Sequence, residues 1–345
     1  MVKGPPISFN TKGTLLALTL LLAIVFLASV SMGRVFIHGA DLFTLVANFI
    51  SGNGNPRDLL SQELVFWWIR VPRCVMAILV GAGLAISGAV YQALFRNPLV
   101  SPDILGVSAG CTFGAALGLV LPFDSFYLVH VMSFGFGLAA VSMSVALARV
   151  IGVKAVMILV LAGMVVLSFF NALLMILKYF SDPYEQLPSI IFWVMGSLSR
   201  VTWENVLVMA PFTLVGIVLF IALGFRLNIL SLGDIQAKSL GLSPVVFRRL
   251  LIVASSFMVA ISVATCGQIA WIGLIIPHMA RAIAGPEHER MIPITALLGA
   301  IFLLTADTIA RTLSTAEIPV GIITALTGAP IFGYLMIKNR GSGWL

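Results

Sequence analysis

Long apolar runs, separated by short polar stretches, follow one another along almost the whole chain. A helix needs about 20 apolar residues to cross a bilayer core of about 30 Å, and most of the runs reach this length. They predict an all-α fold, a polytopic membrane helix bundle with about ten transmembrane helices. The predicted spans are Thr14–Met32, Leu64–Phe95, Ile104–Leu121, Phe126–Val150, Ala155–Tyr179, Val206–Phe225, Leu250–Ile272, Ile292–Leu313 and Val320–Ile337, with His278–Ala284 as a short candidate for one more.

Composition agrees with this pattern. Of the 345 residues, 60% are hydrophobic and 10% charged, whereas a soluble protein carries about 25% charged residues. The first run follows two lysines, as the apolar part of a signal peptide does. However, its length and the lack of a small-residue cleavage site indicate that it is retained as a span. The net charge of +7 lies mostly in short loops, which favours contact with a membrane and gives no indication of nucleic acid.

The distribution of Lys and Arg predicts an orientation. With a cytoplasmic N-terminus and alternating spans, 13 of the 20 Lys and Arg residues fall on the cytoplasmic side. Because cytoplasmic loops carry an excess of these residues, we expect both termini to be cytoplasmic.

Motifs for nucleotide hydrolysis are missing from the sequence. It holds no GxxxxGK[ST] phosphate loop and no GxGxxG after a strand. Energy for transport must therefore come from a partner subunit or an ion gradient. The cysteines Cys74, Cys111 and Cys266 lie far apart in apolar runs, so we interpret them as packing residues.

The mixed segment 226–249 is too polar to span and too apolar for a loop. Asp234 suits a helix start, Gly241 a helix end, and Pro244 the start of a second short helix. We expect two short cytoplasmic helices joined by a tight turn. They form either a docking surface for a partner or an amphipathic element lying on lipid.

Small residues crowd the stretch Gly81–Ala89, which predicts close packing of helix backbones. Separately, a series of motifs occurs in order along the chain. They are Arg70-Val71-Pro72-Arg73, the run from Gly88 to Leu99, Leu105–Gly110, Ser239-Leu240-Gly241-Leu242, Gly273–Arg281, Glu317–Ile322 and Thr327-Gly328-Ala329-Pro330.

From about Arg70 to Lys338 these motifs resemble the FecCD family, the permease subunits of type II ABC importers for iron–siderophore, haem and vitamin B12. The resemblance implies one transmembrane permease domain over 1–345 in the inner membrane, with two copies forming a homodimeric pore. The implied partners are two ATP-binding-cassette ATPase subunits, a periplasmic binding protein and lipid. ATP and Mg would be bound by the ATPase, so no cofactor and no metal site are expected in this chain.

The resemblance also assigns roles to residues. Coupling to the ATPase would fall on Gly233, Asp234, Ala237, Leu240 and Gly241. Arg70 and Arg311 would pair with acidic residues of the binding protein, although arginines at a membrane surface also simply snorkel. Asp307 and Arg311 share a helix face and are a candidate pair.

A cytoplasmic gate is implied at Asn97 and Leu99, where an ordinary helix-ending turn before proline is the alternative. Its second part would fall at Ala155 and Val156, where relatives often carry hydroxyl groups that this chain lacks. For His278 and His288 we expect structural roles rather than metal binding.

Other classes of function remain possible at this stage. An ion-driven secondary transporter usually carries ionisable residues at mid-membrane, and Asp307 is the deepest acidic residue here. A membrane enzyme would need a cluster of catalytic residues, which the sequence lacks. The pathway, with Asn171, Thr324 and Thr327 as its polar points, suits a metal chelate, and a molybdate-type oxyanion is the alternative cargo.

Overall fold

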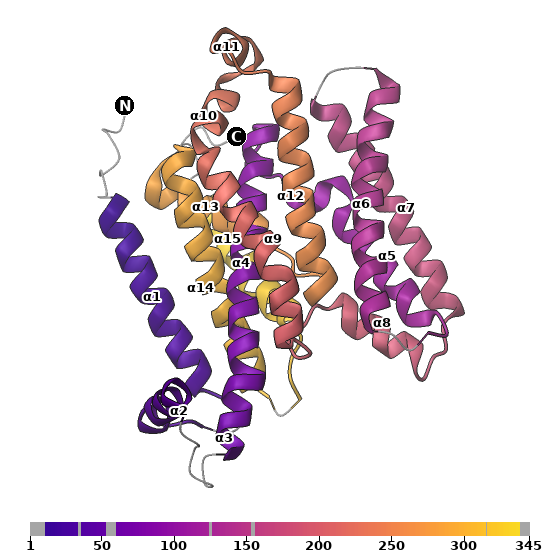
Figure 1. Ribbon diagram of the computed structural model, residues 1–345. Coiled ribbons are helices and arrows are strands. Elements are labelled where there is room, and N and C mark those ends of the chain that lie inside the picture. Colours follow the sequence, from indigo (N-terminus) through magenta and orange to yellow (C-terminus); the bar gives the residue numbers. More distant parts are fainter. Residues whose placement is uncertain are drawn as a thin grey trace.

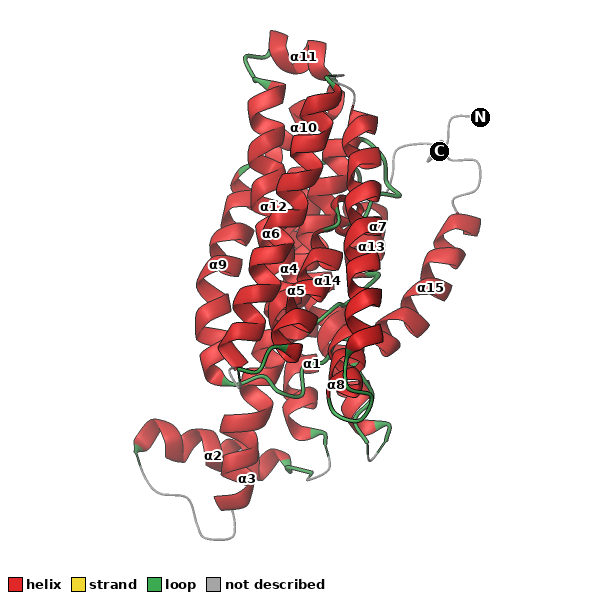
Figure 2. Ribbon diagram, turned by 90° about the vertical axis from the view of Figure 1, so that its right-hand side faces the viewer, coloured by secondary structure: helices red, strands yellow, loops and turns green. Residues whose placement is uncertain are grey.

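The computed structural model describes residues 11–33, 36–52, 60–123, 126–152, 156–314 and 316–338. All regular structure within these ranges is helical, as the apolar runs predict (Figures 1 and 2). The helices are α1 (Thr11–Ser31), α2 (Gly39–Ser51), α3 (Leu60–Leu64), η2 (Val65–Arg70), α4 (Val71–Phe95), η3 (Pro102–Leu105), α5 (Val107–Val120), α6 (Phe126–Ile151), α7 (Val156–Phe180), α8 (Gln186–Val194), α9 (Trp203–Ala222), α10 (Gly224–Leu232), α11 (Asp234–Ser239), α12 (Pro244–Cys266), α13 (Ile272–Ala284), α14 (His288–Thr312) and α15 (Val320–Lys338).

Eight of the described helices are long and apolar enough to cross a membrane, and three apolar helices are shorter. Two expected spans belong to the shorter group. The third span is a 14-residue α5 preceded by the 3-10 turn η3, and α13 has 13 residues. The left-handed Gly106 explains the first case, because it interrupts the predicted run Ile104–Leu121, and Pro102 begins the 3-10 turn ahead of it.

The segment after α9 differs from its prediction in one respect. Gly233, at φ 127°, joins the short helices α10 and α11, and Gly241 lies in the turn that follows. Pro244 does not open a second short helix. It opens the 23-residue α12, because a proline in the first turn leaves the apolar residues after it free to continue the helix.

Helix α4 lies at the centre of the bundle, and nearly all of its residues are buried. Together with α3 and the π-turn η2 it forms one continuous helix, Ser61–Phe95, of 35 residues. Pro72 has no N–H to donate to the residue four before it, and the widened π-turn lies directly ahead of it.

Glycines bring neighbouring backbones into contact with α4. A methyl group on Gly81 would overlap the carbonyl oxygen of Gly299 on α14, and one on Gly88 would overlap Gly273 on α13. Gly110 and Gly114 of α5 approach α6 in the same way. The expected small-residue packing is therefore confirmed, and it fixes α4, α13 and α14 against one another.

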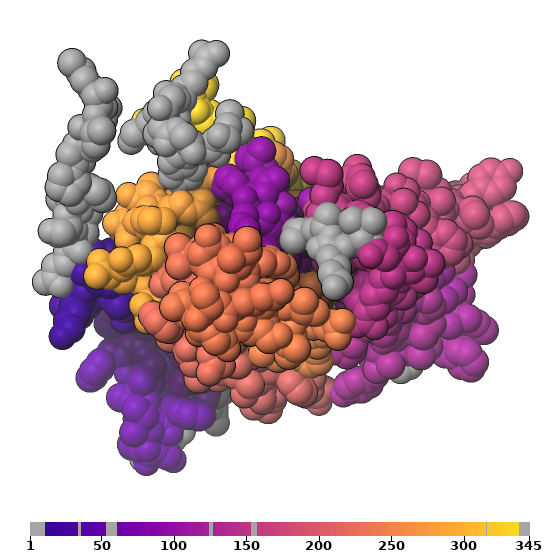
Figure 3. Space-filling model, turned by 90° about the horizontal axis from the view of Figure 1, so that it is seen from above, coloured from indigo at the N-terminus to yellow at the C-terminus, as the bar shows by residue number. Residues whose placement is uncertain are grey.

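The bundle has two distinct ends. The short helix α11 caps one end, and α2, α3 and α8 lie at the other (Figure 1). In Figure 3, which looks onto the α11 end, residues around 230–250 cover the middle beside the end of α4. Between the ends, α7 and α15 leave much of their apolar surface exposed, as lipid-facing or subunit-facing helices do.

Candidate functional site

An open cleft of about 490 Å³ lies at the α11 end, between the last residues of α4, the start of α11 and the first turns of α12. The cleft is lined by apolar residues and by three charged side chains, Arg96, Asp234 and Arg248. Arg96, at the end of α4, therefore meets at one surface two charged groups that lie far along the chain, on α11 and α12.

Asp234 is the centre of this charged group. Its carboxylate accepts hydrogen bonds from Arg96 Nη2 at 2.7 Å and from Arg248 Nη1 at 2.8 Å. Hydrogen bonds from Arg248, with the positive charges of both arginines, lower the pKa of Asp234 below its ordinary value. The side chains of Asp234 and Arg96 are 47% and 39% exposed, so these ion pairs remain in contact with water.

The other residues expected to couple to an ATPase lie around the same helix. Ala237 is buried on the inner face of α11, whereas Leu240 is 59% and Ile235 81% exposed. Gly241 has φ 79° and no atom within 4 Å of the position of a side chain. The helix thus presents apolar side chains outward at an end of the molecule, next to an ionic cleft.

The turn after α4, Asn97–Leu99, is held by side chains. Asn97 Oδ1 accepts the backbone N–H of Leu99 at 2.9 Å, which closes the turn locally. His278 Nε2 is 2.8 Å from the carbonyl oxygen of Pro98 and so ties the turn to α13. Of the second expected gate segment, Ala155 and the side chain of Val156 lie outside the described residues.

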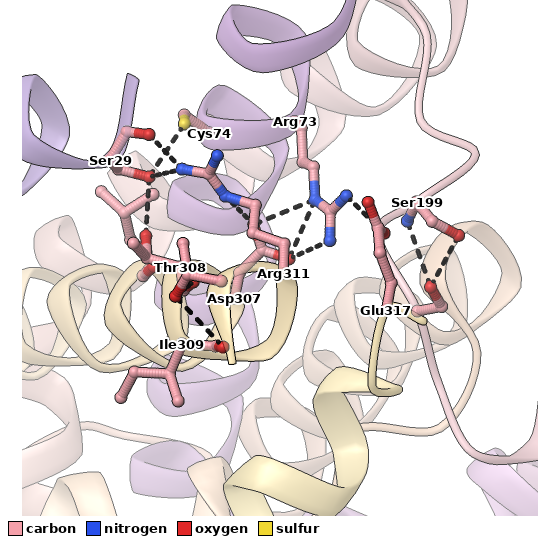
Figure 4. A network of polar contacts seen from close by, with 12 residues as sticks. Ser29, Arg73, Cys74, Ser199, Asp307, Thr308, Ile309, Arg311 and Glu317 are labelled. Carbon is pink, nitrogen blue, oxygen red and sulfur yellow. Dashed lines mark hydrogen bonds and ion pairs between the residues drawn. The ribbon is translucent and has the colours of Figure 1, made fainter. Parts of the chain in front are cut away.

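A second group of charged residues lies at the opposite end, between α4, α14 and the segment that leads to α15 (Figure 4). Arg73 Nε is 3.0 Å from both carboxylate oxygens of Asp307, and its Nη1 is 2.8 Å from Glu317 Oε2. Asp307 is fully buried and Arg73 nearly so. This buried pair is bidentate, the geometry in which an arginine–carboxylate contact is strongest.

Arg70 and Arg311 flank this pair, and both are buried. The Nε atom of Arg311 is 3.8 Å from Asp307 Oδ2, which is the predicted contact, although Arg73 is the main partner of Asp307. Both guanidinium groups also donate to the end of α1, at the carbonyl oxygens of Ser29, Val30, Ser31 and Met32. In this arrangement neither arginine is presented on the outer surface.

Comparison with known proteins identifies the family. Residues 21–338 match the model of the FecCD transport family. The chain belongs to the FecCD transport family. As a FecCD chain, it is the permease subunit of an ABC importer, and the expected fold and class of function are confirmed.

Individual FecCD relatives have different cargoes in their names. The molybdate import permease MolB of Haemophilus influenzae is 40% identical over 95% of this chain and 96% of its own length. The vitamin B12 import permease BtuC of Klebsiella pneumoniae is 35% identical over 97% and 96%. A solved structure described as an inward-facing metal-chelate type ABC transporter is 40% identical, with a TM-score of 0.85 over 95% of this chain and 99% of that chain.

Sequence reasoning missed three residues that the structure brings into these groups. Arg73 is the partner of Asp307, and Arg96 and Arg248 are the partners of Asp234. A buried acid in a membrane segment requires a cation, so Asp307 could have directed attention to Arg73. The Arg96–Asp234 contact joins residues 138 positions apart, and no local pattern indicates it.

Proposed function

We propose that two copies of this chain form a pore that passes a metal chelate, such as an iron–siderophore, haem or a corrinoid, across the bacterial inner membrane. In this proposal α7 forms part of the wall of the pore, and the supporting observation is its apolar character, since it has no charged residue between Val156 and Leu177. A helix of this kind offers no counter-charge to a small oxyanion, whereas a large chelate needs none. The exposed apolar face of α7 suits contact with either lipid or the second copy.

The α11 end is the proposed docking surface for the ATPase, which would bind ATP and Mg outside this chain. Exposed Ile235 and Leu240 beside the ionic cleft support this choice, because apolar side chains at a water-facing end are typical of contact surfaces. Each copy would contact one of two ATPase subunits through Gly233, Asp234, Ala237, Leu240 and Gly241. On this proposal the α11 end would face the cytoplasm, as would both termini by the distribution of Lys and Arg.

The opposite end is the proposed docking surface for a periplasmic binding protein. Arg70 and Arg311 contribute to it if the end of α1 moves away from them, since both now donate to its carbonyl oxygens. The binding protein would then offer carboxylates in place of those carbonyl groups. Asn97 and Leu99, with Ala155 and Val156, remain the proposed gate on the cytoplasmic side.

The cargo is tested on the binding protein of the same importer, where selection takes place. We expect its intrinsic fluorescence or calorimetric titration to report binding of ferric hydroxamate, haemin or cobalamin, and no response to molybdate. Molybdate is the second candidate because the permease MolB, named for it, is 40% identical to this chain. Binding of molybdate with no response to any of the chelates would replace the first proposal by the second.

A further inference from the structure

Arg96 occupies the junction between the central helix and the proposed gate. Helix α4 ends at Phe95, and Arg96 adopts the left-handed conformation with φ 49° and ψ 35°. Such a conformation is uncommon for a residue with a side chain, and it turns the chain directly into Asn97. Any displacement of Arg96 is therefore passed to the gate turn through a single peptide unit.

The side chain of Arg96 reaches in the opposite direction, to the proposed coupling helices. Its Nη2 donates to Asp234 Oδ1 at 2.7 Å, at the first residue of α11, and to the carbonyl oxygen of Leu230 at 3.3 Å, on α10. Both contacts lie next to Gly233, the hinge between these two helices. One side chain thus holds the end of α4 to the point where α10 and α11 meet.

The gate turn is held from its other side by α13. His278 contacts the carbonyl oxygen of Pro98, and Arg281 Nη2 donates to Gln92 Oε1 at 3.2 Å, one turn before the end of α4. The turn is therefore clamped between α13, which glycine contacts fix to α4, and α11, which is attached by half-exposed ion pairs. Of the two attachments, the one through Arg96 is the one that would follow α11 when α11 moves.

We propose that Arg96 is a positioning residue for gating, which transmits movement of α11 to the Asn97–Leu99 turn through its ion pair with Asp234. The inference rests on the proposed function, since it needs an ATPase that moves α11. Arg96 touches neither nucleotide nor cargo in this account. It acts only by keeping the gate turn and the coupling helix in step.

The test uses the complete importer, with its ATPase and binding protein, in proteoliposomes. Uptake of radiolabelled ferric hydroxamate, or of radiolabelled molybdate if the binding protein selects it, is measured together with ATP hydrolysis. The variants are Arg96→Gln, Arg96→Lys, Asp234→Asn and the double variant Arg96→Gln/Asp234→Asn. Arg249→Gln is the matched control, because Arg249 is exposed and adjacent to Arg248 in sequence.

We expect Arg96→Gln to lower cargo transported per ATP hydrolysed by about fivefold or more, the lower end of typical couplings between sites. Basal ATP hydrolysis and assembly should persist, and Arg96→Lys should restore most of the ratio. The double variant should be no worse than Asp234→Asn alone, because both changes remove the same link.

An Arg96→Gln ratio equal to that of Arg249→Gln, in an importer whose wild type is active, would overturn the role of Arg96 alone. Losses that multiply in the double variant would overturn it as well. A wild-type complex without ATP-driven uptake would instead overturn the proposed function, and this inference with it.

Discussion

The two ends of the bundle each carry arginine–aspartate pairs, but the two groups differ in their access to water. At the α2 end, Asp307 is fully buried and Arg73 is 7% exposed. At the α11 end, Asp234 and Arg96 are 47% and 39% exposed. The same chemistry therefore serves two purposes, because separating a buried pair costs several kcal/mol, about 3–5, whereas an exposed pair contributes little to stability and can move with the helices that carry it.

The largest effect is expected from Asp307→Asn. This change leaves Arg73 buried with Glu317 as its remaining carboxylate, and breaking a buried pair costs about 3–5 kcal/mol. Thermal unfolding in detergent, monitored as the loss of monodisperse protein, should show a markedly lower midpoint temperature. Glu287→Gln is the control, since the Arg290–Glu287 pair is more than half exposed and its loss should leave the midpoint nearly unchanged.

Close helix packing is a second source of stability besides the buried charges. Two glycine variants of α4 test the packing without changing any charge. Gly81→Ala pushes a methyl group into the backbone of Gly299, and overpacking of this kind costs about 1–3 kcal/mol. In Gly83→Ala the nearest atoms lie 3.5 Å from the new methyl group, an ordinary contact. A Gly81→Ala midpoint equal to that of Gly83→Ala would contradict the close approach of α4 and α14.

The stability of a variant at the exposed end gives the direct comparison with Asp307→Asn at the buried end. Arg96→Gln should lower the free energy of unfolding by only about 0.2–1 kcal/mol, the range for exposed ion pairs. The same thermal assay in detergent measures it beside Asp307→Asn. If the two variants were equally destabilised, the distinction between a structural end and a movable end would be lost.

The smallest effect is expected from pH. The arginines lower the pKa of Asp234. Its carboxylate is therefore charged at every pH above the ordinary Asp pKa, and it becomes neutral only as the pH falls through the lowered value. Titration of Asp234 should therefore cause no change in transport per ATP near neutral pH. A ratio that followed a titration in that region in the wild type, but not in Asp234→Asn, would disagree with this electrostatic picture.

The sequence predicted the fold well where one physical rule decides the outcome. Long apolar runs indicated α4, α6, α7 and α15 because length and hydropathy alone determine a membrane span. The prediction was wrong where backbone geometry sets a helix boundary, as at Gly106, which interrupts an apolar run, and at Pro244, which opens α12 ahead of an apolar run. At those points local backbone geometry, rather than apolar character, determines where a helix begins.

The candidate sites were predictable only in part. Asn97 lies inside one of the family motifs, whereas Asp234 and Arg311 were assigned roles by the resemblance from their places along the chain. Arg73 and Arg96 acquire their meaning from partners more than 100 residues away, Asp307 and Asp234, and that proximity exists only in the folded bundle. Burial, which separates the two groups of charges in function, is likewise a property of the packed helices.

The most direct test of the central claim is uptake by proteoliposomes that contain this chain, its ATPase and its binding protein. The account predicts that a metal chelate accumulates in the vesicles. This accumulation should require all three components and ATP, and collapse of the proton and sodium gradients should not change it. Accumulation driven by an ion gradient in the absence of the ATPase would contradict it.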